Sequence, residues 1–267
     1  METDTGDRIL TTPMPSPARE GRAAPTPWIL FPPAGGTPDM IAPLAVTAPE
    51  DVAVSVVHYP RRGTRRETPM PSTLRQLAEE CARHVVLTGQ AGRTVVAGFS
   101  MGGLLALETA RALARAGSGP ALLLVVGATA PHRRVPSAER PDQAGLEALL
   151  DESGRLRDPD LRAHAKRLLC MDLALLTAHP VERPRPLRCP VAAVVGADDP
   201  LHDGTRPTGS WRAWTTREFT GRTVPGGHLG LLDPARACEF WSLAAELRAL
   251  LRLERSARRL AVHGRAR

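Results

Sequence analysis

The stretch VVAGFSMGGLL (Val95–Leu105) decides the fold of this chain. Its first residues are apolar and β-branched, which is typical of a buried strand, whereas GGLLALETARALARAG (Gly102–Gly117) has the periodicity of a helix that ends at a glycine. Ser100 therefore stands on a turn between a strand and a helix, with Gly98 and Gly102 on its two sides. Small residues allow such a turn to close without clashes, so the pattern predicts a serine held above the sheet edge.

A serine in this position is a candidate nucleophile, and its surroundings predict an oxyanion hole. The helix that starts near Met101 directs its N-terminal N–H groups toward the same place, where they can stabilise negative charge. A second donor is expected from the loop FPPAGG (Phe31–Gly36), because glycines let the backbone approach a substrate oxygen. The N–H of Ala34 is the first choice, and that of Gly35 is the alternative.

A serine nucleophile needs a base, and the base needs a carboxylate that orients it. On strand–helix scaffolds of this kind, the chain order is serine, then the acid, then histidine. The strand-like run VAAVVG (Val191–Gly196) is followed by ADDP, so an acid leaves the tip of a strand. We expect Asp199 to be this acid, and the adjacent Asp198 stays open as the alternative.

His228 is the expected base. It lies in VPGGHLGLLDP, after the last strand-like run TTREF (Thr215–Phe219) and before the last helix. Gly226 and Gly227 allow that loop to bend. The remaining histidines lie in places that do not fit this order. They are His58 on an early strand, His84 on a helix, His132, His164 and His179 in or beside the predicted lid, His202 close behind Asp199, and His263 in the tail.

Short apolar runs alternate with helical patterns along the chain, which predicts an α/β fold with a mostly parallel sheet. Continuous apolar runs are typical of parallel strands covered on both faces. The predicted strands are Trp28–Phe31, Val52–Tyr59, Thr94–Gly98, Ala121–Gly127, Val191–Gly196 and Thr215–Phe219. The predicted helices are 72–87, with Ser72 or Thr73 as N-cap, Gly102–Gly117 and Ala235–Leu251.

One segment interrupts the alternation. Between Pro131 and Pro190 the sequence has helical patterns at Asp142–Leu150 and Asp158–His179, with Asp158 as N-cap and Pro159 at the first helical position. Two helices between consecutive strands predict a lid at about 132–188, and an extra packing layer is the alternative. The candidate residues for an apolar acyl-binding surface are Leu168, Leu169, Met171 and Leu175.

Composition narrows the class of protein. The net charge is +7, which could attract nucleic acid. With one Tyr and four Phe among 267 residues, however, the chain lacks the aromatics of base-stacking modules, so we do not expect nucleic-acid binding.

The four cysteines form no C-x-x-C pair and fit no zinc spacing, which favours reduced thiols in a cytoplasmic protein. The first 27 residues lack an apolar segment, and the run Ala121–Ala130 is too short to span a bilayer.

These patterns divide the chain into three parts. Residues 1–27 carry five prolines among small polar residues, so we predict a disordered arm there, with order beginning at Trp28. Residues 28–252 form the predicted catalytic domain. Residues 253–267 form a basic C-terminal tail.

Several motifs together resemble the type II thioesterases of polyketide and nonribosomal-peptide assembly lines. They are LFPPAGGTPDM, HYPRRGTRRETP, AGFSMGGLLALE, GADDP and PGGHLGLLDP, and they occur in order between Trp28 and Leu251. The resemblance implies an α/β-hydrolase fold with a helical lid, a triad of Ser100, Asp199 and His228, and an oxyanion hole at Met101 and Ala34. Three positions depart from the family pattern: Phe99 replaces a histidine, Arg61 a glycine and Leu229 an aromatic residue.

The resemblance further implies a serine thioesterase that hydrolyses acyl groups from the phosphopantetheine arm of acyl or peptidyl carrier proteins, without a metal or cofactor. We expect a monomer whose basic clusters, at Arg61, Arg62, Arg65 and Arg66 and in the tail, meet an acidic carrier surface. Two alternatives stay open. One is another α/β-hydrolase, such as a carboxylesterase or a product-releasing acyltransferase, and the other is a catalytically silent partner that binds carrier proteins.

Overall fold

The computed structural model describes the chain except for residues 1–9, 12–23, 137–142, 153–157, 202–206 and 265–267. Its centre is a seven-stranded sheet in the order β1-β3-β2-β4-β5-β6-β7. All neighbouring strands are parallel except β1, which pairs antiparallel with β3. The strands are β1 (Leu10–Thr11), β2 (Thr26–Phe31), β3 (Val52–Val57), β4 (Val95–Phe99), β5 (Leu122–Val126), β6 (Val191–Gly196) and β7 (Phe219–Val224). This architecture is the predicted α/β-hydrolase fold.

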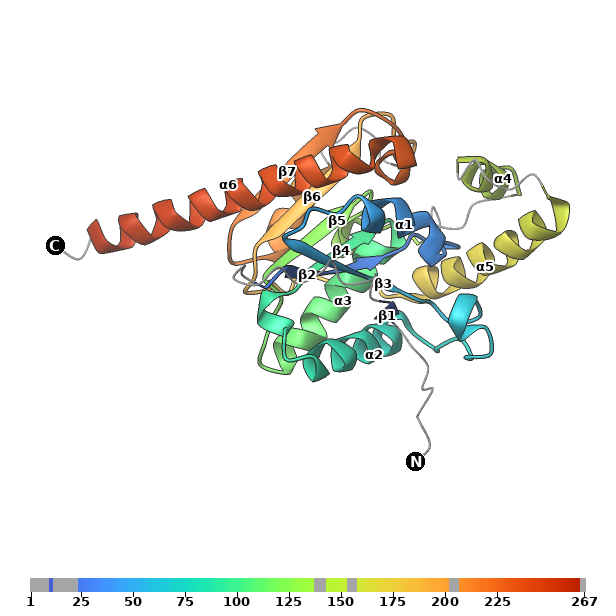
Figure 1. The fold of residues 1–267 in the computed structure, drawn as a ribbon, viewed down its shortest axis with the longest axis horizontal. Coiled ribbons are helices and arrows are strands. Elements are labelled where there is room, and N and C mark those ends of the chain that lie inside the picture. The colour runs from blue at the N-terminus through green and yellow to red at the C-terminus, as the bar shows by residue number, and fades with distance from the viewer. Residues whose placement is uncertain (1–9, 12–23, 137–142, 153–157, 202–206, 265–267) are drawn as a thin grey trace.

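Helices cover both faces of the sheet (Figure 1). The α-helices are α1 (Pro38–Val46), α2 (Leu74–Leu87), α3 (Met101–Arg115), α4 (Gln143–Glu152), α5 (Pro159–Ala178) and α6 (Ala237–Gly264). Short 3₁₀ helices occupy Gly63–Arg65, Ala91–Arg93, Pro131–Arg133, Pro207–Trp214, Gly230–Leu232 and Pro234–Arg236. Helices α2 and α3 lie on one face, α1 and α6 lie on the other, and α4 and α5 lie beyond one end of the sheet.

The alternating side chains of the strands build two cores. In β2, Ile29 and Phe31 face the core beneath α2 and α3, whereas Trp28 and Leu30 face the core beneath α1 and α6. Strand β4 is buried at every residue. A strand covered on both faces needs apolar residues at consecutive positions, which explains why the runs in this sequence do not alternate with polar residues.

The predicted strands β2 to β6 are confirmed, but the last strand was placed wrongly. It runs over Phe219–Val224 rather than Thr215–Phe219. The Thr215 hydroxyl instead donates to the Cys189 carbonyl oxygen at 2.6 Å, in the segment that precedes the strand. Because β7 is the edge strand and is largely half-buried, its sequence lacks the apolar run that marks its neighbours.

The ends of the chain also differ from the prediction. Leu10 and Thr11 of the predicted disordered arm form β1, paired with Val57 and Val56 of β3, and β2 starts at Thr26 instead of Trp28. The rest of that arm up to residue 23 lies outside the described residues. At the other end, the predicted boundary at 252 falls inside α6, whose backbone is helical as far as Gly264.

The cysteines are free thiols, as the sequence indicates: Cys81 and Cys189 are buried, and Cys170 and Cys238 are exposed. Burial raises the pKa of the Cys189 thiol to about 12, so this cysteine is not a reactive thiolate. Across the described stretches of chain, each helix is too short or too polar to cross a membrane.

Candidate active site

Ser100 joins β4 directly to α3 and has backbone angles φ 53° and ψ −120°. An L-residue rarely adopts a positive φ, so the surrounding structure must hold this turn in place. The glycines around it supply the necessary space. A Cβ atom at Gly98 would lie 2.0 Å from the Gly102 carbonyl oxygen, and one at Gly102 would lie 2.3 Å from the Phe31 carbonyl oxygen. The G-x-S-x-G spacing is therefore a steric requirement of this turn.

The structure brings the serine, the histidine and one aspartate into a single hydrogen-bonded chain. The Nε2 atom of His228 lies 2.8 Å from Ser100 Oγ, and its Nδ1 atom lies 2.8 Å from Asp199 Oδ2. Asp199 and His228 are buried, at 4% and 6% exposure. An ionised carboxylate only accepts hydrogen bonds, so His228 donates from Nδ1 and its Nε2 can accept the serine proton.

The two candidate acids have different partners. Asp199 contacts the imidazole, and its other oxygen accepts a 2.9 Å hydrogen bond from the Leu201 N–H. Asp198 instead accepts from the Gly226 N–H at 3.2 Å, which connects the acid loop to the loop that carries His228. The geometry thus favours Asp199 as the orienting carboxylate, the first choice from the sequence.

Two glycines that the sequence reasoning did not single out make room for the histidine loop. A Cβ atom at Gly196, at the end of β6, would lie 2.3 Å from the Gly226 carbonyl oxygen. One at Gly127, just after β5, would lie 3.1 Å from the His228 carbonyl oxygen. A glycine directly after an apolar strand was the available signal, because close backbone approach is a common reason for it.

Other histidines have partners of their own. His58 Nδ1 lies 2.9 Å from the Thr64 hydroxyl, and His132 Nδ1 accepts from the Trp214 indole N–H at 3.0 Å. Burial lowers the pKa of both imidazoles. The imidazole that touches Ser100 is that of His228.

The predicted oxyanion loop is a tight turn next to Ser100. The Gly36 N–H donates to the Pro33 carbonyl oxygen at 3.0 Å, and Gly35 has φ 71°, as the third residue of a type II turn requires. The Gly35 N–H donates to Asp172 Oδ2 at 2.8 Å. Since that donor is engaged, Ala34 remains the better candidate for the loop. Met101 is the first residue of α3, where N–H groups lack partners within the helix.

The predicted lid residues occupy different environments on α5. Leu168 and Leu169 are buried, and a Cβ atom at Gly35 would lie 3.0 Å from that of Leu169, so this leucine packs on the oxyanion loop. Met171 is half-buried, and Leu175 packs against the core beneath α2 and α3. Their contact with a substrate stays a prediction.

A buried ion pair beside the oxyanion loop escaped the sequence reasoning. Asp172 of α5 and Arg62 form two hydrogen bonds, at 2.7 and 2.8 Å, and each side chain is 1% exposed. The available signal was a single charge in the apolar run LLCMDLALL (Leu168–Leu176), because an unpaired charge is not buried in a folded protein.

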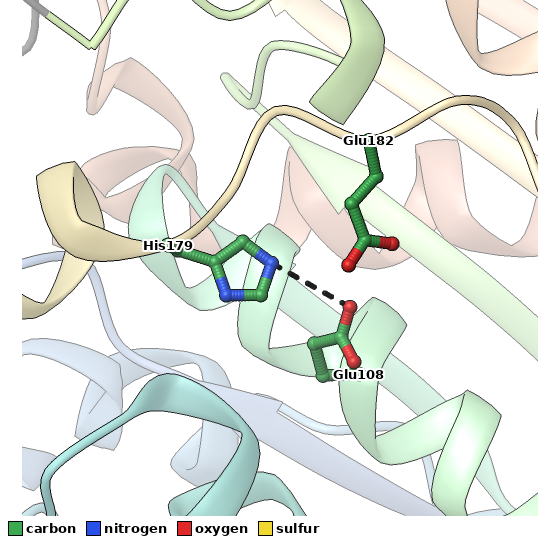
Figure 2. Close-up of side chains that lie close together, drawn as sticks. All are labelled: Glu108, His179 and Glu182. Atoms are coloured by element: carbon green, nitrogen blue, oxygen red, sulfur yellow. Dashed lines mark ion pairs between the residues drawn. The ribbon is translucent and has the colours of Figure 1, made fainter.

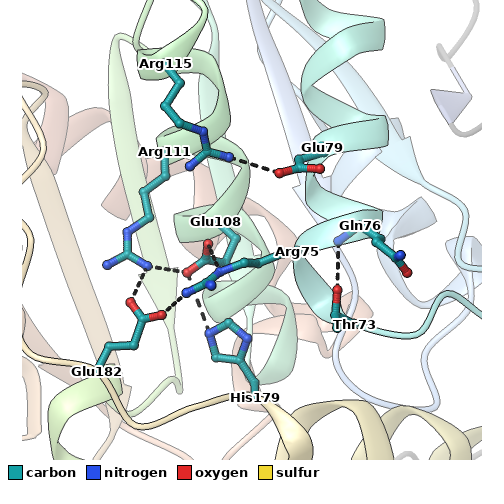
Figure 3. A network of polar contacts seen from close by, with 9 residues as sticks. All are labelled: Thr73, Arg75, Gln76, Glu79, Glu108, Arg111, Arg115, His179 and Glu182. Carbon is teal, nitrogen blue, oxygen red and sulfur yellow. Dashed lines mark hydrogen bonds and ion pairs between the residues drawn. The ribbon is translucent and has the colours of Figure 1, made fainter.

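A second polar cluster lies between α3 and the segment after α5 (Figure 2). One ligand atom from each of Glu108, His179 and Glu182 lies within 4.8 Å of the others, a spacing that would suit a metal ion. Figure 3 shows, however, that Arg75 and Arg111 bind the two carboxylates: each guanidinium contacts both Glu108 and Glu182. A cation placed here would face two positive charges, so we interpret the cluster as an ion-pair network.

Comparison with known proteins agrees with this geometry. The family model for the thioesterase domain matches residues 26–243. A probable cadicidin biosynthesis thioesterase from Streptomyces griseus is 29% identical over 209 residues, covering 76% of this chain and 57% of that protein. The chain thus spans less than two thirds of the length of this curated relative.

Solved structures give similar matches. The RedJ thioesterase of the prodiginine pathway in Streptomyces coelicolor is 30% identical with a TM-score of 0.72, over 88% of this chain and 91% of RedJ. The type II thioesterase BorB of the borrelidin cluster is 27% identical with a TM-score of 0.72, over 90% of this chain and 98% of BorB. By its sequence and its fold, the chain belongs to the thioesterase family.

Proposed function

We propose that this protein is a serine thioesterase that hydrolyses acyl groups from the phosphopantetheine arm of carrier proteins in a polyketide or nonribosomal-peptide synthase. The observation that carries the proposal is the hydrogen-bonded chain Ser100–His228–Asp199 at the ends of parallel strands in a thioesterase fold. The names of the relatives, which are biosynthetic thioesterases, support the substrate class.

In the first half of the reaction, Ser100 Oγ attacks the thioester carbonyl carbon while His228 Nε2 takes its proton. Asp199 accepts from His228 Nδ1 and stabilises the imidazolium that forms. The N–H groups of Met101 and Ala34 donate to the developing oxyanion. The tetrahedral species then collapses, the C–S bond breaks, and the pantetheine sulfur leaves as a thiol with the proton held by His228.

In the second half, water attacks the acyl-serine ester. His228 Nε2 removes a proton from the water, the same N–H groups stabilise the second oxyanion, and the protonated imidazole returns a proton to Ser100 Oγ. The products are the free acid and the regenerated serine. The proton of Ser100 moves along a hydrogen bond that the structure contains, from Oγ to His228 Nε2, and the same nitrogen then serves the leaving sulfur and the water in turn.

The test compares hydrolysis of acetyl-, propionyl- and longer acyl-pantetheine, free and carrier-bound, with hydrolysis of p-nitrophenyl esters. We expect thioesters to be preferred, with carrier-bound substrates turned over best. Ser100→Ala should lower kcat by a factor of about 10⁴ or more, because the nucleophile is lost. Ser242→Ala is the matched control, since Ser242 is an exposed serine on α6 that donates to the Cys238 carbonyl oxygen.

Two results would contradict the proposal. Turnover of oxygen esters alone would indicate another α/β-hydrolase, such as a carboxylesterase. Carrier binding without turnover of any substrate would indicate a silent binding partner.

A further inference from the structure

Asp172 is an acidic residue of α5 whose carboxylate is fully engaged inside the protein. Its Oδ1 accepts from Arg62 Nη2 at 2.7 Å, and its Oδ2 accepts from Arg62 Nη1 at 2.8 Å and from the Gly35 N–H at 2.8 Å. The side chain is 1% exposed. One carboxylate of α5 therefore holds both an arginine side chain and a backbone N–H of the oxyanion loop.

Arg62 contacts the same loop a second time. Its Nη1 donates to the Gly36 carbonyl oxygen at 2.9 Å, and its Nε donates to the Pro60 carbonyl oxygen at 3.2 Å. The guanidinium also lies over the Tyr59 ring, 5.3 Å from its centre, and the Tyr59 hydroxyl donates to the Pro32 carbonyl oxygen at 2.6 Å.

The loop that carries Ala34 is consequently fixed at three backbone groups: the Pro32 carbonyl, the Gly35 N–H and the Gly36 carbonyl. Ala34 lies between the first and second of these anchors. The Gly35 N–H that Asp172 binds lies in the peptide plane that joins Ala34 to Gly35. The Ala34 N–H lies in the preceding plane, which joins Pro33 to Ala34 and meets the first plane at the Ala34 Cα atom, so fixing one plane restricts the other. Without the Asp172 carboxylate, the Gly35 N–H loses its acceptor, and the loop is held only at the Pro32 and Gly36 carbonyls.

The C-terminal end of α5 is also fastened to the body of the protein. Arg134 donates to the carbonyl oxygens of Leu176 and His179, and His179 Nε2 lies 3.6 Å from Glu108 of α3 (Figure 3). Helix α5 is thus held both at its middle, by Asp172, and at its end.

Stability alone is a weak reason for a buried ion pair, because apolar side chains of similar volume often stabilise a protein equally well or better. We propose that Asp172 and Arg62 are positioning residues: they align the Ala34 N–H for the oxyanion, so that the oxyanion hole is complete only while α5 is docked. The inference rests on the proposed roles of Ser100 as nucleophile and of the loop Phe31–Gly36 as part of the oxyanion hole. It implies that α5 helps to position the oxyanion hole.

The first test is Asp172→Asn, which keeps the shape of the side chain and removes its charge. We expect kcat to fall by a factor of about 10², near the effect of losing one oxyanion donor, with KM unchanged. The affinity for an acyl trifluoromethyl ketone, which adds to Ser100 Oγ as a tetrahedral oxyanion, should fall by a similar factor. Binding of the corresponding non-hydrolysable thioether should not change. Asp160→Asn, on the exposed first turn of α5, is the matched control.

A second variant separates positioning from folding. The double change Arg62→Met with Asp172→Leu replaces the ion pair by apolar side chains. It should unfold at a denaturant concentration near that of the wild type and still lose activity and ketone affinity about 10²-fold.

The proposal would be overturned if either variant folded and kept the kcat and the ketone affinity of the wild type. If Asp172→Asn does not fold, the same two measurements on the double variant test the proposal. Addition to the ketone and p-nitrophenyl ester hydrolysis report on Ser100 whatever the natural substrate is. A failure of the thioesterase assignment would therefore be distinguished from a failure of this inference.

Discussion

Ser100 and Arg61 are the non-glycine residues with positive φ angles in the described part of the chain, at 53° and 67°. At Ser100 the unusual backbone places the hydroxyl next to His228, and the glycines around it are what permit the turn. At Arg61 the side chain is exposed, and the backbone N–H donates to the Arg65 carbonyl oxygen at 2.9 Å. The motif resemblance assigns a glycine to this position, and the angle explains why: glycine adopts it without steric cost.

Arg61→Gly should therefore stabilise the protein. Relief of the left-handed backbone strain outweighs the greater freedom of glycine in the unfolded chain, so we expect the free energy of unfolding to rise by up to about 1 kcal/mol. Urea denaturation of the two proteins measures the difference. Arg66→Gly, at a neighbouring exposed arginine with an ordinary φ of −54°, should instead leave stability unchanged or lower it. A loss of stability in Arg61→Gly would show that the arginine side chain contributes more than its backbone costs.

At the scale of single elements, α2 shows how a helix start is specified. The Thr73 hydroxyl accepts from the Gln76 N–H at 3.2 Å, and the Gln76 side chain accepts from the Ser72 N–H at 2.7 Å. The sequence left Ser72 and Thr73 open as caps. The structure assigns the cap to Thr73, whose backbone is extended, while Ser72 contributes only its backbone N–H.

Thr73→Ala should lower the free energy of unfolding by about 1 kcal/mol, because one N–H of the first turn loses its acceptor. Ser72→Ala keeps the backbone N–H that binds Gln76 and should change stability by less than about 0.5 kcal/mol. Thermal or chemical denaturation of both variants measures the contrast. Equal losses in the two variants would mean that the cap assignment is wrong.

At the scale of the whole molecule, the ion-pair network joins three parts of the chain. Arg75 comes from α2, Glu108 and Arg111 come from α3, and His179 and Glu182 follow α5 (Figure 3). Burial alone would raise the pKa of Glu108, but the contact with His179 and the charges of Arg111 and Arg75 hold it below its ordinary value of 4.5. The carboxylate is therefore charged in the folded protein, and its charge contributes to stability.

This shift has a defined pH dependence. A carboxyl group whose pKa is lower in the folded than in the unfolded chain stabilises the fold above pH 4.5, and the contribution is lost as the pH falls below that value. Glu108→Gln should lower the free energy of unfolding by about 2 kcal/mol at pH 7, because it removes one of the two carboxylates that Arg75 and Arg111 share and leaves Glu182 as their only acidic partner in this network. The difference from the wild type should shrink in acid.

Urea denaturation of both proteins from pH 7 down to about pH 3 tests the sign of this dependence, because the contribution is lost below pH 4.5. Glu79→Gln is the matched control, because Glu79 pairs with Arg115 on the surface, where its side chain is 48% exposed. We expect that control to change stability by less than about 1 kcal/mol. A difference between wild type and Glu108→Gln that grows in acid would contradict the assignment.

The sequence by itself determined the α/β class, the strands β2 to β6 and the order of the candidate serine, acid and histidine. These features have local causes. A continuous apolar run fits a strand covered on both faces. The glycines around Ser100 are required because the backbone packs tightly at that single turn. The cap at Asp158 could also be predicted, and the cap of α2 could be limited to Ser72 or Thr73, since a capping side chain acts within three residues of itself.

Only the tertiary structure decided the features whose partners are distant in the chain. Asp172 and Arg62 are 110 residues apart, and Asp172 and Gly35 are 137 apart. No local pattern specifies which arginine or which N–H a buried carboxylate meets, and the choice of Asp199 over Asp198 likewise depends on where the His228 loop lies. For the same reason, the edge strand β7 was placed too early in the chain and the strand at Leu10–Thr11 was missed. The pairing of each is set by a neighbouring strand, while its own residues carry little apolar signal.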